Sequence, residues 1–203
     1  MPTINASARR IRVKIVYYGA GLSGKTTNLE KLHLHYPSDN RGDMVVLDTE
    51  SERTLFFDYF PAHLGKLGGL TLQVDFFTVP GQSFYNTTRT SVLRGVDGIV
   101  FVADSSPDRE VANEMSLDNL GVNLETLGRR LDDIPLVFQW NKRDVPGAIA
   151  TSVLSKQLNR RGAPEIEAVA VKGTGVWETQ KLILGHTIEA LKRQFAQKRG
   201  AVT

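Results

Sequence analysis

The alternation of apolar and polar positions predicts six strands along this chain of 203 residues. In the first segment Ile11, Val13 and Ile15 alternate with charged residues, as in a strand exposed on one face. Three later segments are continuously apolar, which is typical of strands buried on both faces of a sheet. The alternation in 70–79 favours a half-exposed edge strand. The predicted strands are residues 11–18, 53–60, 70–79, 98–103, 135–140 and 166–171.

The segments between these predicted strands have the apolar spacing of helices. Residues 25–35 predict a short helix, and the leucines that follow Asp108 recur at the three- and four-residue spacing of one buried helix face. A further helix is predicted near 175–197. Strands that alternate with helices predict an α/β fold, with a mostly parallel sheet of six to seven strands and helices on both faces. Such sheets bind ligands at the carboxyl ends of their strands.

A glycine-rich segment joins the first predicted strand to the first helix. Residues 19–26 read GAGLSGKT and match the phosphate-binding P-loop, G-x-x-x-x-G-K-[ST]. Small residues let backbone N–H groups surround an anion, and the helix start adds its positive dipole end. The alternative is a glycine-rich turn without a ligand. The predicted nucleotide-binding residues here are Gly19, Gly21, Leu22, Ser23, Gly24, Lys25, Thr26 and Thr27, with Lys25 on the β- and γ-phosphates and the Thr26 hydroxyl on Mg²⁺.

A second motif, Asn-Lys-Arg-Asp at 141–144, follows the buried strand 135–140. The Asp144 carboxylate can accept hydrogen bonds from N1–H and the exocyclic amine of guanine, whereas adenine would leave it unpaired. Asn141 can either tie this loop to the P-loop or contact the base, and the Lys142 stem can lie over the base plane. Alone these four residues could form a polar turn. Combined with the P-loop they predict binding of GTP and GDP.

Composition narrows the class of protein further. The chain has no cysteine, which excludes disulfides and thiolate metal sites and favours a reducing, cytoplasmic compartment. No apolar run reaches the length of a membrane span, and prenylation of a C-terminal cysteine is impossible, so we expect no stable membrane anchor. The net charge of +3 is small and the basic residues are dispersed, so we expect no nucleic-acid partner.

The order of these motifs resembles a Ras-like small GTPase, and longer strings are similar to its bacterial MglA branch of polarity and motility GTPases. The resemblance covers about residues 10–195 and implies the three-layer P-loop NTPase (Ras-like) fold. It also implies one small-GTPase domain, 1–203, with a core of about 10–195 and short flexible ends. The strings are KIVYYGAGLSGKTTNL at 14–29, ERTLFFDYFP at 52–61, TVPGQSFYN at 78–86, RGVDGIVFVADS at 94–105 and QWNKRD at 139–144.

The resemblance implies Mg²⁺ as cofactor, bound by Thr26 and by Thr54, which matches the switch I threonine. On spacing alone Thr54 is equally well an ordinary strand residue. Switch II begins with Thr78 where the typical Asp-x-x-Gly has aspartate, so a carboxylate that would hold a magnesium-bound water is missing. Our hypothesis is that the Thr78 hydroxyl holds that water. The Gly81 N–H is expected to bond the γ-phosphate.

Two residues are expected to be catalytic. Gln82 matches the glutamine that orients the attacking water in Ras-like enzymes. The resemblance implies that Arg53 is an arginine finger supplied by the chain itself, a group that can contribute about 10³–10⁵ in rate. The alternatives are an exposed loop glutamine and a surface arginine at a strand edge.

The last base-contacting segment departs from the Ras-like Ser-Ala-Lys, because here Val169-Ala170-Val171 stands in its place, with Lys172 one position later. The Ala170 N–H can still donate to guanine O6, since any residue except proline has that donor. Val171 can replace the usual lysine stem with an apolar contact.

The resemblance finally implies partners and location. The implied partners are an MglB-like Roadblock-fold homodimer that activates GTP hydrolysis, and motility and polarity effectors. The chain is expected to be a monomer when free and to be enriched at a cell pole in the GTP state. Three alternatives stay open: an ATP-using P-loop kinase or ATPase, a GTP-binding scaffold with little turnover, and a motility protein acting through filaments. Aromatic residues near the switches fit a partner surface or a core equally well: Phe56, Phe57, Tyr59, Phe60 and Phe84.

Overall fold

The computed structural model describes residues 3–5, 9–47, 57–81 and 85–200. Arg53, Thr54, Phe56, Gln82 and Phe84 therefore lie outside the described residues. The strands form one sheet in the order β3-β4-β5-β2-β6-β7-β8, and β1 pairs with β2 beside this row. The β5-β2-β6-β7-β8 portion is parallel, whereas β1, β3 and β4 pair antiparallel with their neighbours. This architecture confirms the predicted α/β fold with a mostly parallel sheet.

The elements have the following bounds. The strands are β1 (Thr3–Asn5), β2 (Arg10–Tyr18), β3 (Val45–Leu47), β4 (Phe57–Leu67), β5 (Leu70–Thr78), β6 (Gly98–Asp104), β7 (Leu136–Asn141) and β8 (Glu165–Glu167). The α-helices are α1 (Lys25–His35), α2 (Asn86–Leu93), α3 (Glu110–Thr126), α4 (Thr151–Leu158) and α5 (Val176–Gly200). The described 3₁₀ turns are η1 (Ser38–Asn40), η3 (Pro107–Arg109), η4 (Leu131–Asp133) and η5 (Ala170–Lys172).

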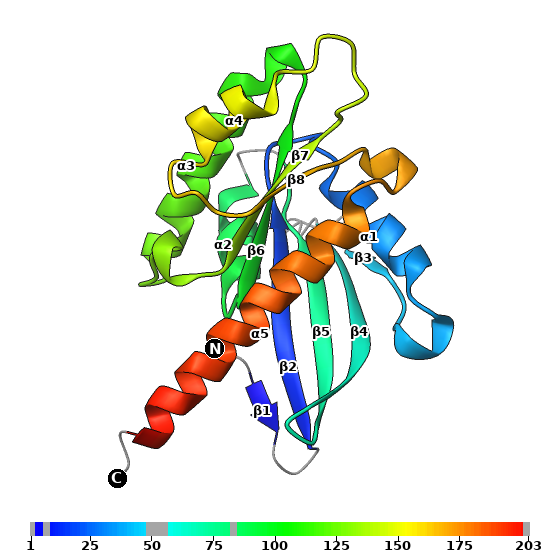
Figure 1. Ribbon diagram of the computed structural model, residues 1–203, viewed down its shortest axis with the longest axis vertical. Coiled ribbons are helices and arrows are strands. Elements are labelled where there is room, and N and C mark those ends of the chain that lie inside the picture. Colours follow the sequence, from blue (N-terminus) through cyan, green and yellow to red (C-terminus); the bar gives the residue numbers. More distant parts are fainter. Residues whose placement is uncertain (1–2, 6–8, 48–56, 82–84, 201–203) are drawn as a thin grey trace.

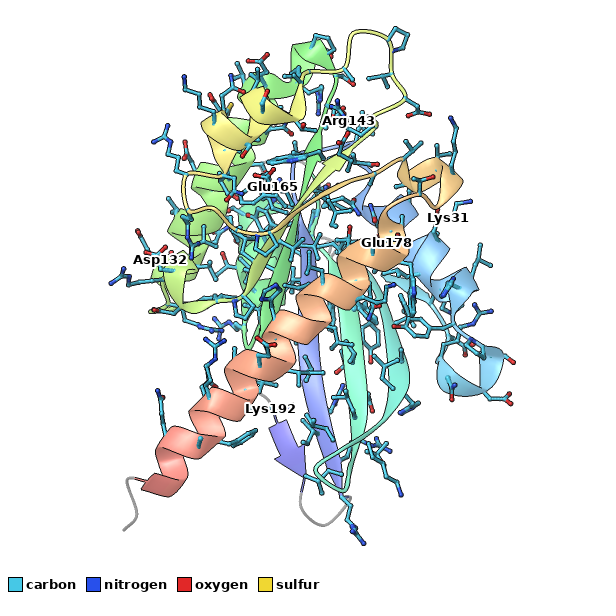
Figure 2. All side chains as sticks on the ribbon, in the orientation of Figure 1. Lys31, Asp132, Arg143, Glu165, Glu178 and Lys192 are labelled. Carbon is cyan, nitrogen blue, oxygen red and sulfur yellow. The ribbon has the colours of Figure 1, made fainter. Side chains whose placement is uncertain are left out.

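Helices cover both faces of the sheet, so the molecule has two hydrophobic cores. Successive residues of β2 serve opposite faces: Ile15 packs in the core under α1 and α5, whereas Val16 packs in the core under α2, α3 and α4. Figure 1 shows α5 crossing the sheet diagonally on one face and α3 and α4 together on the other. The labelled Glu178 and Lys192 project from α5 in Figure 2, and both are exposed. The alternation of side chains in a strand explains this division.

The predicted helices at 25–35 and 175–197 are confirmed by α1 and α5. The strand predicted at 166–171 is wrong in its second half, because β8 ends at Glu167 and Ala170–Lys172 form η5. The chain turns there at Gly173, whose φ of 79° favours glycine. The apolar run therefore corresponds to a short strand followed by a turn in which Ala170 is buried and Val171 is exposed. Regular structure also reaches past both ends of the predicted 10–195 core, in β1 and in the last turn of α5.

The edge position expected for 70–79 is also wrong. β5 pairs with β2 on one side and β4 on the other, and Gln73 and Asp75 are buried. Their polar groups are paired: Arg12 Nε donates to Asp75 Oδ2 at 2.9 Å, and Gln73 Nε2 donates to Asp75 Oδ1 at 2.7 Å. The alternation in 70–79 predicts an exposed strand face, whereas the polar residues Gln73 and Asp75 are buried and hydrogen-bonded inside the sheet.

Candidate nucleotide-binding site

The P-loop leaves the carboxyl end of β2 and leads directly into α1. Leu22 and Gly24 have positive φ values of 64° and 99°, so the backbone curls around a central space. Gly24 caps α1 without a side-chain hydrogen bond, and the first turn of α1 holds no acidic residue. The leading N–H groups of the helix are therefore not occupied by a capping side chain, and they suit an anion.

Lys25 is buried in this loop with only 6% of its surface exposed. Its Nζ donates to the carbonyl oxygens of Gly19 at 3.0 Å and Ala20 at 2.7 Å. Burial, with the nearby charge of Arg89, lowers the pKa of Lys25 to about 7, although Asp58 acts in the opposite direction. Among the described residues no carboxylate lies within ion-pair distance of Lys25. A cation held only by carbonyl dipoles is suited to a phosphate group.

Asn141 connects the P-loop to the loop of residues 168–171, as one of the two roles considered from the sequence expects. Its Nδ2 donates to the Ser23 carbonyl at 2.8 Å, and its Oδ1 accepts from the Ala170 N–H at 2.9 Å. A Cβ on Gly24 would lie 2.2 Å from the Asn141 amide nitrogen, so glycine is needed there. The Ala170 N–H, expected to face guanine O6, is engaged by Asn141 in this structure.

The loops of 141–145 and 169–171 line a cavity of about 270 Å³ beside Leu22 and Thr27. Asn141, Lys142, Asp144, Ala170 and Val171 all line it, so the five residues predicted to contact the base come together. Lys172 Nζ lies 3.1 Å from Asp144 Oδ2, and both side chains are partly exposed. An exposed ion pair of this kind is worth little, so Lys172 can leave the Asp144 carboxylate at small cost.

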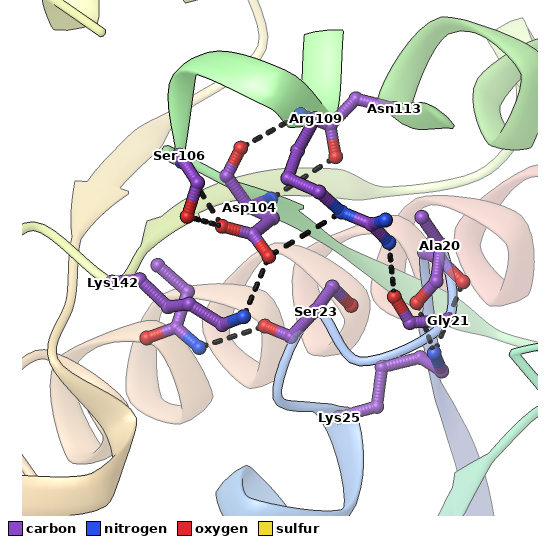
Figure 3. Close-up of polar contacts among 11 residues, drawn as sticks. Ala20, Gly21, Ser23, Lys25, Asp104, Ser106, Arg109, Asn113 and Lys142 are labelled. Atoms are coloured by element: carbon purple, nitrogen blue, oxygen red, sulfur yellow. Dashed lines mark hydrogen bonds and ion pairs between the residues drawn. The ribbon is translucent and has the colours of Figure 1, made fainter. Parts of the chain in front are cut away.

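Lys142 lines this cavity, and Figure 3 shows its ammonium group beside the Asp104 carboxylate. Lys142 Nζ contacts Asp104 Oδ2 at 2.6 Å, while Asp104 Oδ1 accepts from the N–H and hydroxyl of Ser106. Burial opposes ionisation of Asp104, but the hydrogen bonds from Lys142 and Ser106 outweigh it and hold the pKa of this carboxyl below its usual value. Arg109 lies on the other side, with Nε 3.7 Å from Asp104 and Nη2 donating to the Gly21 carbonyl at 2.5 Å.

The start of switch II rests on the P-loop. A Cβ on Gly81 would lie 2.4 Å from Gly21 Cα and 3.3 Å from Lys25 Nζ, so only glycine fits there. Arg89 of α2 donates to the carbonyl oxygens of Pro80 at 2.8 Å and Gly81 at 2.7 Å. The backbone of residue 81 is thereby held against the P-loop, close to the Lys25 ammonium.

The phosphate side of the site is a cavity of about 430 Å³ that includes Lys25, Thr26, Asp58, Thr78 and Gly81. Thr26 Oγ1 donates to Asp58 Oδ2 at 2.6 Å. A hydroxyl and a carboxylate side by side are oxygen donors of the kind that Mg²⁺ selects, so the residues fit this cation. The Thr78 hydroxyl is engaged twice by Asp58, donating to Oδ2 and accepting from the Asp58 N–H, both at 2.9 Å.

Four residues that contact the candidate site were missed by reasoning from sequence: Asp58, Arg89, Asp104 and Arg109. Asp58 and Asp104 lie within strings that carry the resemblance but were given no role there, and Arg89 and Arg109 lie outside those strings. All four are brought to the site by folding. Asp104 had a usable indication, because a carboxylate at the carboxyl end of a buried strand is expected at the ligand-binding edge. Asp58 and Arg89 had none, since a charged residue in a strand or a short helix is usually exposed.

The chain is similar to several known proteins. It is 47% identical to the mutual gliding-motility protein MglA of Myxococcus xanthus over 193 aligned residues. The aligned segment covers 95% of this chain and 99% of the Myxococcus protein. It is 31% identical over 169 residues to ADP-ribosylation factor-like protein 6 of Caenorhabditis briggsae, covering 81% and 80%. ADP-ribosylation factor-like protein 1 of Saccharomyces cerevisiae is 26% identical over 171 residues. No protein-family model matches the chain.

Proposed function

The chain belongs to the MglA family of Ras-like small GTPases, and we propose that it is a GTP-driven switch that controls cell polarity and motility through partners that bind its GTP state. As a member of this family it is a GTP hydrolase with GTP as substrate and GDP as product. The connection of this switch to polarity and motility rests on its similarity to the gliding-motility protein.

The observation that carries the proposal is the tether from Asn141 to the Ser23 carbonyl. It places the loop of Asp144 beside the P-loop, and the two cavities on either side share Leu22, Gly24 and Thr27. One ligand that has a polyphosphate at one end and a purine at the other can fill both. The nucleotide contacts that we propose come from Gly19, Gly21, Leu22, Ser23, Gly24, Lys25, Thr26, Thr27, Gly81, Asn141, Lys142, Asp144, Ala170 and Val171.

For the metal we propose Thr26, together with Thr54, as hydroxyl ligands of Mg²⁺. When bound, Mg²⁺ supplies charge neutralisation at the β- and γ-phosphate oxygens. The chain's own groups do the rest of the work: Lys25 binds the phosphates, Gly81 offers its N–H to the γ-phosphate, Gln82 orients the attacking water and Arg53 stabilises the charge of the transition state. Of these, Arg53, Thr54 and Gln82 fall outside the described residues.

We propose that an MglB-like Roadblock-fold homodimer stimulates hydrolysis, that motility and polarity effectors bind the GTP state, and that this state gathers at a cell pole. No helix in the described part of the chain is long and apolar enough to cross a membrane. Of the aromatic residues considered for a partner surface, Phe60 is fully buried and belongs to the core. Phe57 and Tyr59 are half-buried, and Phe57 lines the cavity on the phosphate side.

Binding of GDP, ADP and xanthosine diphosphate to the wild-type protein and to Asp144→Asn, measured by calorimetry with Mg²⁺ present, tests this proposal. We expect the wild type to prefer GDP over ADP by at least about 10³-fold, because adenine leaves a buried hydrogen-bonding group unpaired. Asp144→Asn should lose GDP affinity and gain affinity for xanthosine diphosphate, whose carbonyl accepts from the new amide. Equal wild-type affinities for GDP and ADP would favour an ATP-using P-loop enzyme instead.

A further inference from the structure

Thr78 lies where most Ras-like proteins have an aspartate, so the position that would hold a magnesium-bound water has no carboxylate of its own. The structure shows a carboxylate at this place that comes from another strand. β4 and β5 pair antiparallel with Tyr59 opposite Phe77, and this register sets Asp58 across from Thr78. The backbone N–H of Asp58 donates to Thr78 Oγ1, which fixes the two residues against each other.

The Asp58 side chain points into the phosphate cavity. It is 6% exposed, lines the cavity together with Lys25 and Thr26, and accepts through Oδ2 from the hydroxyl groups of both Thr26 and Thr78. Within the described part of the chain, no hydrogen bond is made to its other oxygen, Oδ1. The carboxylate therefore has one oxygen that is fixed and one that is available.

We propose that Asp58 is the carboxylate of the magnesium site and takes the role of the missing switch II aspartate. A threonine hydroxyl that donates its proton to a carboxylate turns its lone pairs away from that carboxylate and becomes a better oxygen ligand. Thr26 is held in this way by Asp58 Oδ2, and Asp58 Oδ1 is available for a water bound to the metal. Thr78 then orients the Asp58 side chain through its two hydrogen bonds. This proposal replaces our hypothesis that the Thr78 hydroxyl itself holds the water.

Electrostatics supports this assignment. Asp58 is a buried carboxylate without an ion-pair partner among the described residues, and the nearest cation in the cavity, Lys25, is directed at backbone carbonyls. Buried charges in proteins are normally paired or bound to a metal. A divalent cation at Thr26 would compensate Asp58 and would leave Lys25 for the phosphates.

The test is the rate at which a fluorescent GDP analogue dissociates as a function of free Mg²⁺, from chelator alone to an excess of the cation. For Asp58→Asn we expect a release rate in chelator within about threefold of wild type, because the base and phosphate contacts are intact. The Mg²⁺ concentration that half-maximally slows release should rise about 10–100-fold, the usual cost of losing a carboxylate that orients a metal ligand. An unchanged Mg²⁺ requirement overturns the proposal, and so does tighter retention, which would mean that Asp58 competes with the metal for Thr26.

Two further variants secure the interpretation. Asp75→Asn is a matched control, because Asp75 is an equally buried carboxylate of the same sheet whose hydrogen bonds are to Arg12 and Gln73. The Mg²⁺ requirement of this variant should equal that of wild type. Thr78→Val removes both hydrogen bonds that orient Asp58 and should raise the requirement at least about fivefold, the worth of one such bond. If Asp58→Asn does not fold, Thr78→Val carries the test, and an unchanged requirement there overturns the proposal.

This inference rests on the proposed function, and the two fail differently. If GDP and ADP bind equally well to the wild type, the proposed function fails. If GDP is preferred but Asp58→Asn keeps the wild-type Mg²⁺ requirement, only the assignment of Asp58 fails.

Discussion

Asp104 lies between Lys142 of the proposed base-recognition loop and Arg109, which contacts the P-loop. It is 1% exposed at the end of β6, it holds the Lys142 ammonium, and Arg109 beside it donates to the P-loop at Gly21. Lys142 has a φ of 63°, a left-handed conformation that costs a non-glycine residue about 1–2 kcal/mol. The ion pair with Asp104 fixes the side chain of Lys142, which lines the proposed base cavity.

Asp104→Asn should release GDP about tenfold faster than wild type, because it removes the charged partner of Lys142 and keeps the acceptor for Ser106. The factor is modest because Lys142 is one third exposed, and solvent screens the pair. Stopped-flow displacement of a fluorescent GDP analogue measures it. The preference for guanine over xanthine should stay unchanged, unlike in Asp144→Asn.

A control variant and a double mutant test whether the effect of Asp104→Asn acts through Lys142. Asp132→Asn removes an exposed partner of Arg130 and Arg161 and should leave GDP release as in wild type. In the Lys142→Met background, Asp104→Asn should add nothing, since its effect acts through Lys142. Additive effects on release would show that Asp104 supports the fold and does not position Lys142.

At the scale of elements, the close packing of α5 against β6 depends on Gly98. A Cβ on Gly98 would lie 2.2 Å from Thr187 Oγ1, 2.9 Å from Ile15 Cδ1 and 3.3 Å from Ile183 Cδ1. Thr187 and Ile183 belong to α5, so a side chain at 98 would push the helix off the sheet. A glycine at the first residue of a buried strand thus sets the distance between two layers.

Gly98→Ala should lower the free energy of unfolding by about 1–3 kcal/mol, the usual cost of overpacking a core. Urea denaturation at equal excess of GDP measures it, since bound nucleotide adds to apparent stability. Gly121→Ala is the control, because a Cβ there meets nothing within 4 Å on α3, and alanine in a helix should stabilise by about 0.5–1 kcal/mol. A neutral Gly98→Ala would mean that α5 can shift without cost.

At the scale of the whole molecule, the sheet brings the carboxyl ends of β2, β6 and β7 to one edge, where the P-loop, Asp104 and Asn141 meet. The adjacent end of β5 leads into Gly81, so the nucleotide edge and switch II are continuous. A partner that binds over this edge can therefore act on the residues around the γ-phosphate. This continuity is what a switch needs, because the presence of one phosphate can change the surface offered to a partner.

Arg53→Ala and Gln82→Leu should each lower hydrolysis stimulated by an MglB-like homodimer by about 10³-fold or more, because both are proposed to act on the transition state. GDP affinity should stay within about threefold of wild type. Single-turnover hydrolysis with and without the homodimer measures both effects. Arg193→Ala, which removes an exposed arginine of α5, is the control and should behave as wild type. Normal stimulated turnover by Arg53→Ala would refute its role.

Local sequence determined the phosphate loop, the base motif and the alternation of strands with helices, because each depends on residues within a few positions of one another. The tertiary structure decided what depends on strands and loops far apart in the chain. It placed β5 inside the sheet, engaged the Ala170 N–H with Asn141, and set Asp58 beside Thr26, 32 residues away, through the register of β4 on β5. No local sequence pattern encodes the register of two strands or the hydrogen bonds between distant loops. Both follow from how the helices pack on the two faces of the sheet.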